Sequence, residues 1–140
     1  MNRMNLVSLA LAVLSVGVSA CAGASAGPAV VLTCDDFQAA NHINREVQVS
    51  AGEVLVVDLC SNTTTGFSWE PARIEDGSVL QQLSEEFKAP DSKAVGAAGR
   101  NVWRFKALSK GTSTVSLAYS RPWGGGEKGL WTLTLTILVR

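Results

Sequence analysis

The 140-residue chain carries 12 basic and 12 acidic residues, and its formal net charge is zero. No block or stripe of Lys and Arg is present, so nucleic acid is not expected as a partner. The only histidine, His42, is not spaced with the three cysteines like a ligand set, and we expect neither a metal nor a cofactor.

Residues 1–20 predict an export signal. Arg3 precedes the apolar run LVSLALAVLSVGV, which is too short to span a membrane as a stable helix. The run ends in VSAC, which resembles a bacterial lipobox, in which cleavage leaves Cys21 as a lipidated N-terminus. Ala22 looks like an outer-membrane sorting residue. We therefore expect a lipid anchor in the bacterial cell envelope, at the outer membrane facing the periplasm. An ordinary secretory signal cleaved near Ala20 is the alternative, but it gives no reason for the cysteine.

Residues 21–30 are rich in Ala, Gly and Ser and predict a flexible tether, followed by one domain over 31–140. Cys34 and Cys60 remain as a pair, and an exported domain favours a disulfide between them. Closing that loop would stabilise the fold by about 3.5 kcal/mol in the chain-entropy model. Two separate buried thiols are the alternative.

Short alternating runs then follow one another along the chain. VLVVDLC at 54–60 predicts a central strand. Further strands are predicted at residues 45–50, 67–69, 102–107, 113–120 and 131–139. Val115, Leu117 and Tyr119 should face inward. Residues 79–90 fit a strand or a short helix, and residues 34–44 are ambiguous. The count of seven or eight strands predicts an all-β, two-sheet antiparallel sandwich of immunoglobulin-like size.

No catalytic constellation is visible in the sequence. Asp35 and Asp36 are adjacent, as are Glu85 and Glu86, so in a strand each pair would point to opposite faces. No serine lies in a Gly-x-Ser-x-Gly elbow, and the glycines after Trp123 lead into a strand rather than a helix. The sequence therefore indicates a binding protein and not an enzyme.

Three segments between the strands carry unusual residues for simple connections. Arg and Trp are enriched in interface hot spots, and glycine lets another backbone approach closely. Each segment alone fits a turn or a strand end. In a sandwich, loops at one end can form a single surface. The segments comprise Asn62, Thr63, Thr64, Thr65, Gly66 and Phe67; Gly96, Ala97, Ala98 and Gly99; and Arg121, Pro122 and Trp123.

In this order the segments resemble the chagasin family, proteinaceous inhibitors of papain-like cysteine proteases. NTTTGFSW resembles the first family motif, with Thr63 in place of proline. GAAG resembles the second, with Ala98 in place of glycine, and Arg-Pro-Trp at 121–123 matches the third in full. The resemblance covers about residues 44–140.

The resemblance implies an inhibitor that docks the three loops across the cleft of a papain-like protease. Thr64 would lie over the catalytic cysteine, residues 96–99 beside the substrate groove, and Trp123 on an aromatic surface. A proline at a compatible position typically contributes about 0.4–1 kcal/mol to the free energy of unfolding by restricting the unfolded chain. Position 63 lacks this proline, so the backbone of the first loop is less restricted, and we expect weaker inhibition than by the best family members. We expect a monomer.

An envelope-anchored immunoglobulin-like adhesion or carbohydrate-binding module is the rival reading. It would need an exposed aromatic platform on a sheet face, for which Trp69, Trp103 and Trp131 are the available residues, although Trp69 and Trp103 suit the core better. A structural accessory lipoprotein has no positive sequence support.

Overall fold

The computed structural model describes residues 27–140, so the predicted signal peptide, the lipidation at Cys21 and most of the tether lie outside it. No helix in the described part is long and apolar enough to cross a membrane. Its elements are β1 (Ala29–Leu32), α1 (Cys34–Ala39), β2 (His42–Val49), β3 (Val54–Ser61), η1 (Thr63–Thr65), β4 (Ser68–Trp69), β5 (Arg73–Ile74), β6 (Leu80–Lys88), β7 (Gly99–Ala107), β8 (Gly111–Ser120) and β9 (Trp131–Val139). Because β1 begins at Ala29, the last two residues of the predicted tether belong to the fold.

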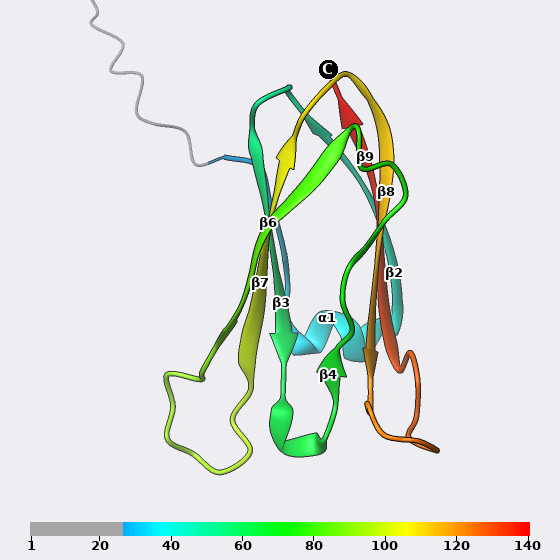
Figure 1. Cartoon of the computed structure of the whole chain (residues 1–140). Coiled ribbons are helices and arrows are strands. Elements are labelled where there is room, and N and C mark those ends of the chain that lie inside the picture. Colours follow the sequence, from blue (N-terminus) through cyan, green and yellow to red (C-terminus); the bar gives the residue numbers. More distant parts are fainter. Residues whose placement is uncertain (1–26) are drawn as a thin grey trace, which may run out of the picture.

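The strands form two facing sheets, as the sequence predicts for an all-β sandwich (Figure 1). One sheet has the order β1-β3-β7-β6, and the other has β2-β9-β8-β4 with β5 also on β8. The other strand pairs are antiparallel, as predicted, but two pairs at the sheet edges are parallel: β1 with β3 and β2 with β9. Only a hairpin requires antiparallel neighbours, and neither of these pairs is joined by one.

The core follows the alternation of the strands. Val115, Leu117 and Tyr119 of β8 face inward and are at most 2% exposed. On β9, Leu133, Leu135 and Ile137 face the core while Thr132, Thr134 and Thr136 stay on the outer face. The sequence predicted both patterns, because a strand with one buried face must alternate.

Residues 34–44, ambiguous in the sequence, fold as α1 and the start of β2. Thr33 caps the helix: its hydroxyl accepts from the Asp36 N–H at 3.2 Å, and the Asp36 carboxylate accepts from the Thr33 N–H at 2.7 Å. Phe37 is fully buried with its ring centroid 5.4 Å from that of Trp69. The structure joins Cys34 to Cys60 of β3 by a disulfide, so α1 is tied to the sandwich from both sides.

Residues 79–90, which fitted either a strand or a helix, form the edge strand β6 with an irregular register between Gln82 and Ser84. β6 and β7 make a long hairpin arm that reaches the lower end of Figure 1. The turns after β3 and β8 reach the same end, so this end carries all three predicted segments.

Candidate functional site

Three connections meet at one end of the sandwich and are defined here as loop 1 (61–67), loop 2 (89–98) and loop 3 (121–130) (Figure 1). The sequence placed Gly99 in the second of these, but the structure makes it the buried first residue of β7. A Cβ on Gly99 would collide with the Lys88 carbonyl and the Phe87 ring, so this glycine serves strand pairing and not presentation. The presented part of the segment is Gly96 to Ala98.

Loop 1 is a short 3-10 turn that Asn62 caps. Its side-chain oxygen accepts from the backbone N–H of Thr64 at 3.2 Å and from the Thr64 hydroxyl at 2.6 Å. The three threonines are exposed, and Gly66 ends the turn with a φ of 80°, a conformation that favours glycine. The threonine run is therefore held as a compact turn, with its side chains open to solvent.

Tyr119 anchors the start of loop 1 from below. Its hydroxyl accepts from the Asn62 N–H at 2.9 Å and donates to the Asn62 carbonyl at 3.1 Å. The Tyr119 ring is 1% exposed and stacks on Phe67. Sequence reasoning placed this side chain inward but did not assign it to the loop, although a buried tyrosine hydroxyl normally needs a partner.

A hydrogen bond joins loop 1 to loop 2. The Asn62 amide Nδ2 donates to the carbonyl of Gly96 at 3.1 Å, across 34 residues of sequence. Gly96 has a φ of 79°, and Ala98 is exposed without a left-handed conformation, so the alanine fits its place. Asn62 therefore shapes loop 1 with its oxygen and holds loop 2 with its nitrogen.

Loop 3 packs directly on loop 1. Trp123 is 51% exposed, yet a Cβ built on Gly66 would lie 2.6 Å from its Cη2 atom, so the indole covers the glycine backbone. Arg121 places its guanidinium carbon 4.5 Å from the centroid of Phe67, which is buried. Phe67, predicted as a contact residue, is thus the base on which Arg121 lies, while Pro122 and Trp123 are presented.

Lys128 stabilises loop 3 from within, a role that sequence reasoning missed. Its ammonium donates to the carbonyls of Arg121 and Trp123, the latter at 3.2 Å. The Gly126 N–H also donates to the Trp123 carbonyl, at 3.1 Å. Nothing in the local pattern GGGEKG indicated that the Lys128 ammonium would bond to carbonyls earlier in the same loop.

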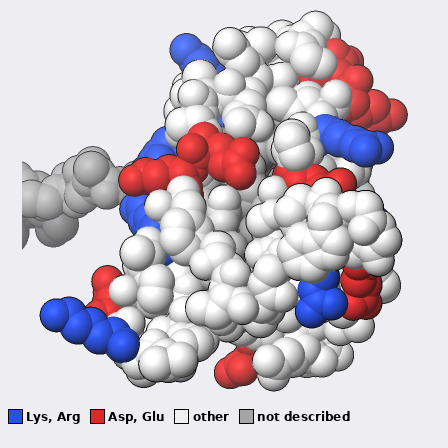
Figure 2. Space-filling view, turned by 60° about the horizontal axis from the view of Figure 1, so that its bottom comes forward, with Lys and Arg blue, Asp and Glu red and all other residues white. Residues whose placement is uncertain are grey.

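Most residues of the surface formed by the three loops are uncharged. Loop 1 carries no charged residue, loop 2 carries Asp91 and Lys93, and loop 3 carries Arg121, Glu127 and Lys128. Figure 2 shows this end as a mostly white area with acidic and basic side chains toward its margins. A surface of threonine hydroxyls, glycine backbone and one indole suits close contact with another protein chain, because little charge must be desolvated.

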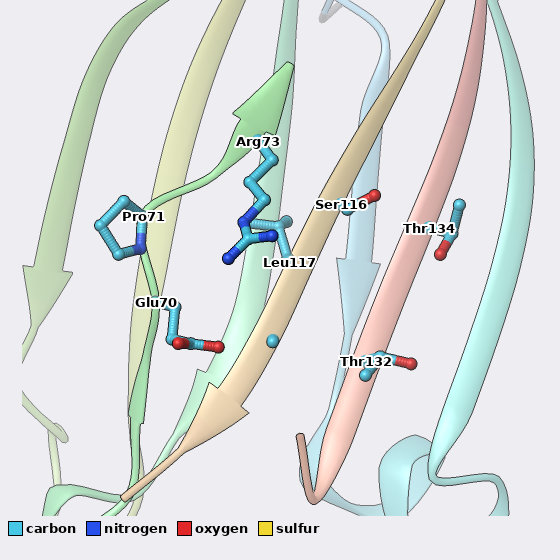
Figure 3. A pocket seen from close by; sticks show the side chains of 8 residues that line it. Glu70, Pro71, Arg73, Ser116, Leu117, Thr132 and Thr134 are labelled. Atoms are coloured by element: carbon cyan, nitrogen blue, oxygen red, sulfur yellow. The ribbon is translucent and has the colours of Figure 1, made fainter. Parts of the chain in front are cut away.

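A hollow on the outer face of the second sheet lies apart from the loops (Figure 3). Glu70, Arg73, Thr132 and Thr134 line it without a nucleophile–base pair or a second carboxylate. No group of His, Cys, Asp and Glu in the described residues is arranged to hold a metal ion. This hollow has none of the side-chain arrangements that catalysis uses.

The tryptophans named for an aromatic platform pack inward. Trp103 is fully buried, Trp69 is 6% exposed, and Trp131 is half-buried with its ring stacked 4.7 Å from that of Tyr119. No platform of the kind that a sugar-binding module needs is therefore built from these three residues.

Comparisons with known proteins agree with the geometry. The family model described as "Chagasin family peptidase inhibitor I42" matches residues 48–137. Amoebiasin-2 of Entamoeba histolytica is 30% identical over 115 residues, covering 78% of this chain and 94% of that protein. Chagasin of Trypanosoma cruzi is 32% identical over 87 residues, covering 60% of this chain and 79% of that protein.

Solved structures show the same fold. The crystal structure of the cysteine protease inhibitor EhICP2 from Entamoeba histolytica has a TM-score of 0.63 at 25% identity, covering 81% of this chain and 96% of that one. PbICP-C, solved in complex with falcipain-2, has a TM-score of 0.62 at 17% identity over 81% of this chain and all of that one, and here the likeness concerns the fold alone. With a family match over most of the domain and relatives that are inhibitors rather than enzymes, this chain belongs to the chagasin family of peptidase inhibitors.

Proposed function

We propose that this protein is a tight-binding inhibitor of papain-like cysteine proteases and that loops 1, 2 and 3 together occlude the catalytic cleft. The observation that carries the proposal is that three segments far apart in sequence contact one another as one surface, through Asn62 with Gly96 and Trp123 with Gly66. The comparisons support the target class, since the matching family model describes peptidase inhibitors and EhICP2 is named a cysteine protease inhibitor.

Loop 1 would cover the catalytic cysteine without serving as a substrate. Its turn is closed by hydrogen bonds from Thr65 N–H to the Asn62 carbonyl at 3.3 Å and from Gly66 N–H to the Thr63 carbonyl at 3.2 Å. Proteases bind substrates as extended chains, so a peptide bond inside this turn is not offered for attack. With Thr64 at the exposed centre, the loop fills the cleft, and the inhibitor should remain uncleaved.

Loops 2 and 3 would contact the protease on either side of loop 1. The backbone of Gly96 to Ala98 would run beside the substrate groove, and Trp123 would stack on an aromatic surface of the protease. Because contacts between loops already hold these groups, little conformational entropy is lost on binding. An interface of this type buries about 1,600 Å² in total.

The proposal includes the cellular setting. Lipidation at Cys21 would anchor a monomeric domain to the bacterial cell envelope, at the outer membrane facing the periplasm. The support is the sequence VSAC before residue 22. Labelling with a radioactive fatty acid, compared between the natural chain and Cys21→Ser, tests the anchor, and equal labelling of both would contradict it.

The decisive experiment is a titration of papain and a cathepsin-L-like enzyme, with trypsin as the serine-protease control. We expect inhibition of the first two only, with the inhibitor's mass unchanged after long incubation. Trp123→Ala and Thr64→Arg should each weaken inhibition by about 30-fold or more, because a central anchor is lost or a clash is added. No inhibition at micromolar concentration would overturn the proposal.

A further inference from the structure

A recess of about 290 Å³ opens between α1, loop 1 and loop 3. Its lining combines aromatic and aliphatic side chains with one cation, and comprises Cys34, Gln38, Asn62, Thr65, Phe67, Tyr119, Arg121, Leu130 and Trp131. The wall made by α1 lies before residue 48, outside the part of the chain that the family model matches. Through this recess, α1 adds a surface to the three-loop site, although it belongs to a different part of the chain from the loops.

Arg121 brings unused hydrogen-bonding capacity to this recess. The Arg100–Asp58 pair is the one salt bridge formed within residues 27–140, so Arg121 has no carboxylate partner there. Its Nε is buried without a hydrogen-bond partner, and its Nη2 donates only a long bond of 3.5 Å to the Thr65 carbonyl. A guanidinium with free donors beside aromatic rings is a strong site for a carboxylate, since Arg pairs with carboxylates in a two-pronged geometry.

The α1 wall of the recess is fixed in place. Cys34 is bonded to Cys60, Thr33 and Asp36 form a reciprocal cap, and the Phe37 ring lies 5.0 Å from that of Trp131. Gln38 is exposed on this helix and lines the recess, so its side chain can be changed without disturbing buried packing.

We propose that the recess receives an Asp or Glu side chain from the rim of the target protease's cleft, and that Arg121 pairs with it while α1 contacts the same rim. The inference rests on the proposed function and deepens it, because it predicts which papain-like proteases are preferred. Two observations support this occupant. The recess adjoins loops 1 and 3, and its single charged group is an unpaired cation.

The test changes charge at Gln38, which belongs to none of the three loops. Gln38→Glu places a carboxylate beside Arg121, where it competes with the incoming acidic side chain, so inhibition should weaken by about tenfold or more. Gln38→Lys adds a second cation and should leave inhibition equal or tighter. The matched controls are Gln48→Glu and Gln48→Lys on β2, where another exposed glutamine lies outside the recess, and neither should change inhibition.

Carbodiimide cross-linking gives a second readout. It joins a lysine amine to a carboxylate, so a complex of the Gln38→Lys variant with its target should yield a cross-link that peptide mapping assigns to a rim Asp or Glu. The Gln48→Lys complex should not.

The outcomes separate the two proposals. If the natural domain inhibits but both charges at Gln38 act alike, or no cross-link forms at position 38, the recess inference is overturned and the inhibitory function stands. If the natural domain inhibits no papain-like protease, both fall.

Discussion

The two ends of the sandwich differ in where their hydrogen bonds go. At the end opposite the loops, bonds stay within one turn or extend the pairing of neighbouring strands: Ser50 N–H donates to Glu53 Oε1 at 2.9 Å, and Ser78 N–H donates to Asp76 Oδ1 at 2.9 Å. At the loop end, Asn62 bonds across to Gly96 and Trp123 covers Gly66. A simple connection between strands needs only hydrogen-bond partners for its own backbone groups. A surface built from several loops also needs contacts that fix the loops to one another.

Loop 1 also differs in its side chains from the turns of the opposite end. The turns of the opposite end carry charged residues such as Glu53, Asp76 and Lys110, which keep a simple turn solvated. Loop 1 carries none and instead exposes hydroxyls beside a half-exposed indole. The following experiments change matched residues at the two ends, so that effects on binding separate from effects on stability.

Among these matched pairs the largest effect is expected for Gly66→Ala, with Gly52→Ala as the control. Both glycines have left-handed backbones, with φ of 80° and 90°, so each alanine should cost about 1–2 kcal/mol of stability. Only at Gly66 would the new Cβ collide with Trp123, because nothing lies within 4 Å of a Cβ at Gly52. We expect about 30-fold weaker inhibition of papain for Gly66→Ala alone.

An equal loss of inhibition in both glycine variants would show that the contact between loops 1 and 3 has no special role. Chemical unfolding of both variants supplies the stability comparison.

Tyr119→Phe removes the hydroxyl that holds Asn62 and leaves a part-buried N–H without its partner. We expect a loss of about 1–3 kcal/mol in the free energy of unfolding and about tenfold weaker inhibition. Ser113→Ala is the control at the other end, where the fully buried Ser113 hydroxyl accepts from the Asp76 N–H at 3.0 Å. It should lower stability while leaving the inhibition constant unchanged, and a matching change in that constant would contradict the role given to Tyr119.

Asn62→Ser isolates the bond between loops 1 and 2. Serine is also a good cap for a helical turn, so the Thr64 N–H keeps an acceptor, but no amide remains to donate to Gly96. Inhibition should weaken by about threefold, the worth of one ordinary hydrogen bond. Asn101→Ser, which removes a 3.3 Å bond to Glu85 on the sheet, is the control and should inhibit as the natural chain does.

The smallest effect concerns acid stability. Hydrogen bonds from the backbone and then the side chain of Thr33 lower the pKa of Asp36, and those from the hydroxyl and then the N–H of Ser78 lower the pKa of Asp76. A depressed folded-state pKa gives stability that is fully present above the ordinary value of 3.8 and is lost as the pH falls through the folded-state value.

Urea unfolding should therefore show Asp36→Asn and Asp76→Asn to be slightly less stable than the natural chain at neutral pH, with the difference shrinking as the pH falls below 3.8. A difference that persisted in acid would mean that the charge of these carboxylates is not what stabilises the two ends.

The sequence predicted what depends on local pattern. β8 and β9 were predicted because one face of each is buried, which forces alternation over many residues. The helix α1 was left open although Thr33 and Asp36 stand three apart, the spacing of a reciprocal cap. That signal precedes a helix of only six residues, too short for periodicity to add support.

Contacts between segments that are far apart in sequence could not be predicted from the sequence. The parallel pairing of β1 with β3 and the bond from Asn62 to Gly96 each join segments that are far apart in sequence within the first sheet and its connections, and no local window contains both partners. The same is true of Phe67. An aromatic residue after a glycine turn fits either a presented contact or a buried base, and only the packed structure showed that Arg121 lies on it.

The parallel entry of β1 sets the direction in which this protein can reach. Ala29 lies beside Val56 and Leu32 beside Leu59, so the chain enters the sandwich at the end remote from the loops and runs toward them with β3 (Figure 1). If Cys21 is held at a membrane, the domain would be attached through the end at which β1 enters, and the three loops would lie at its opposite end. A protease would then approach the loops from the side opposite to the end at which β1 enters the fold.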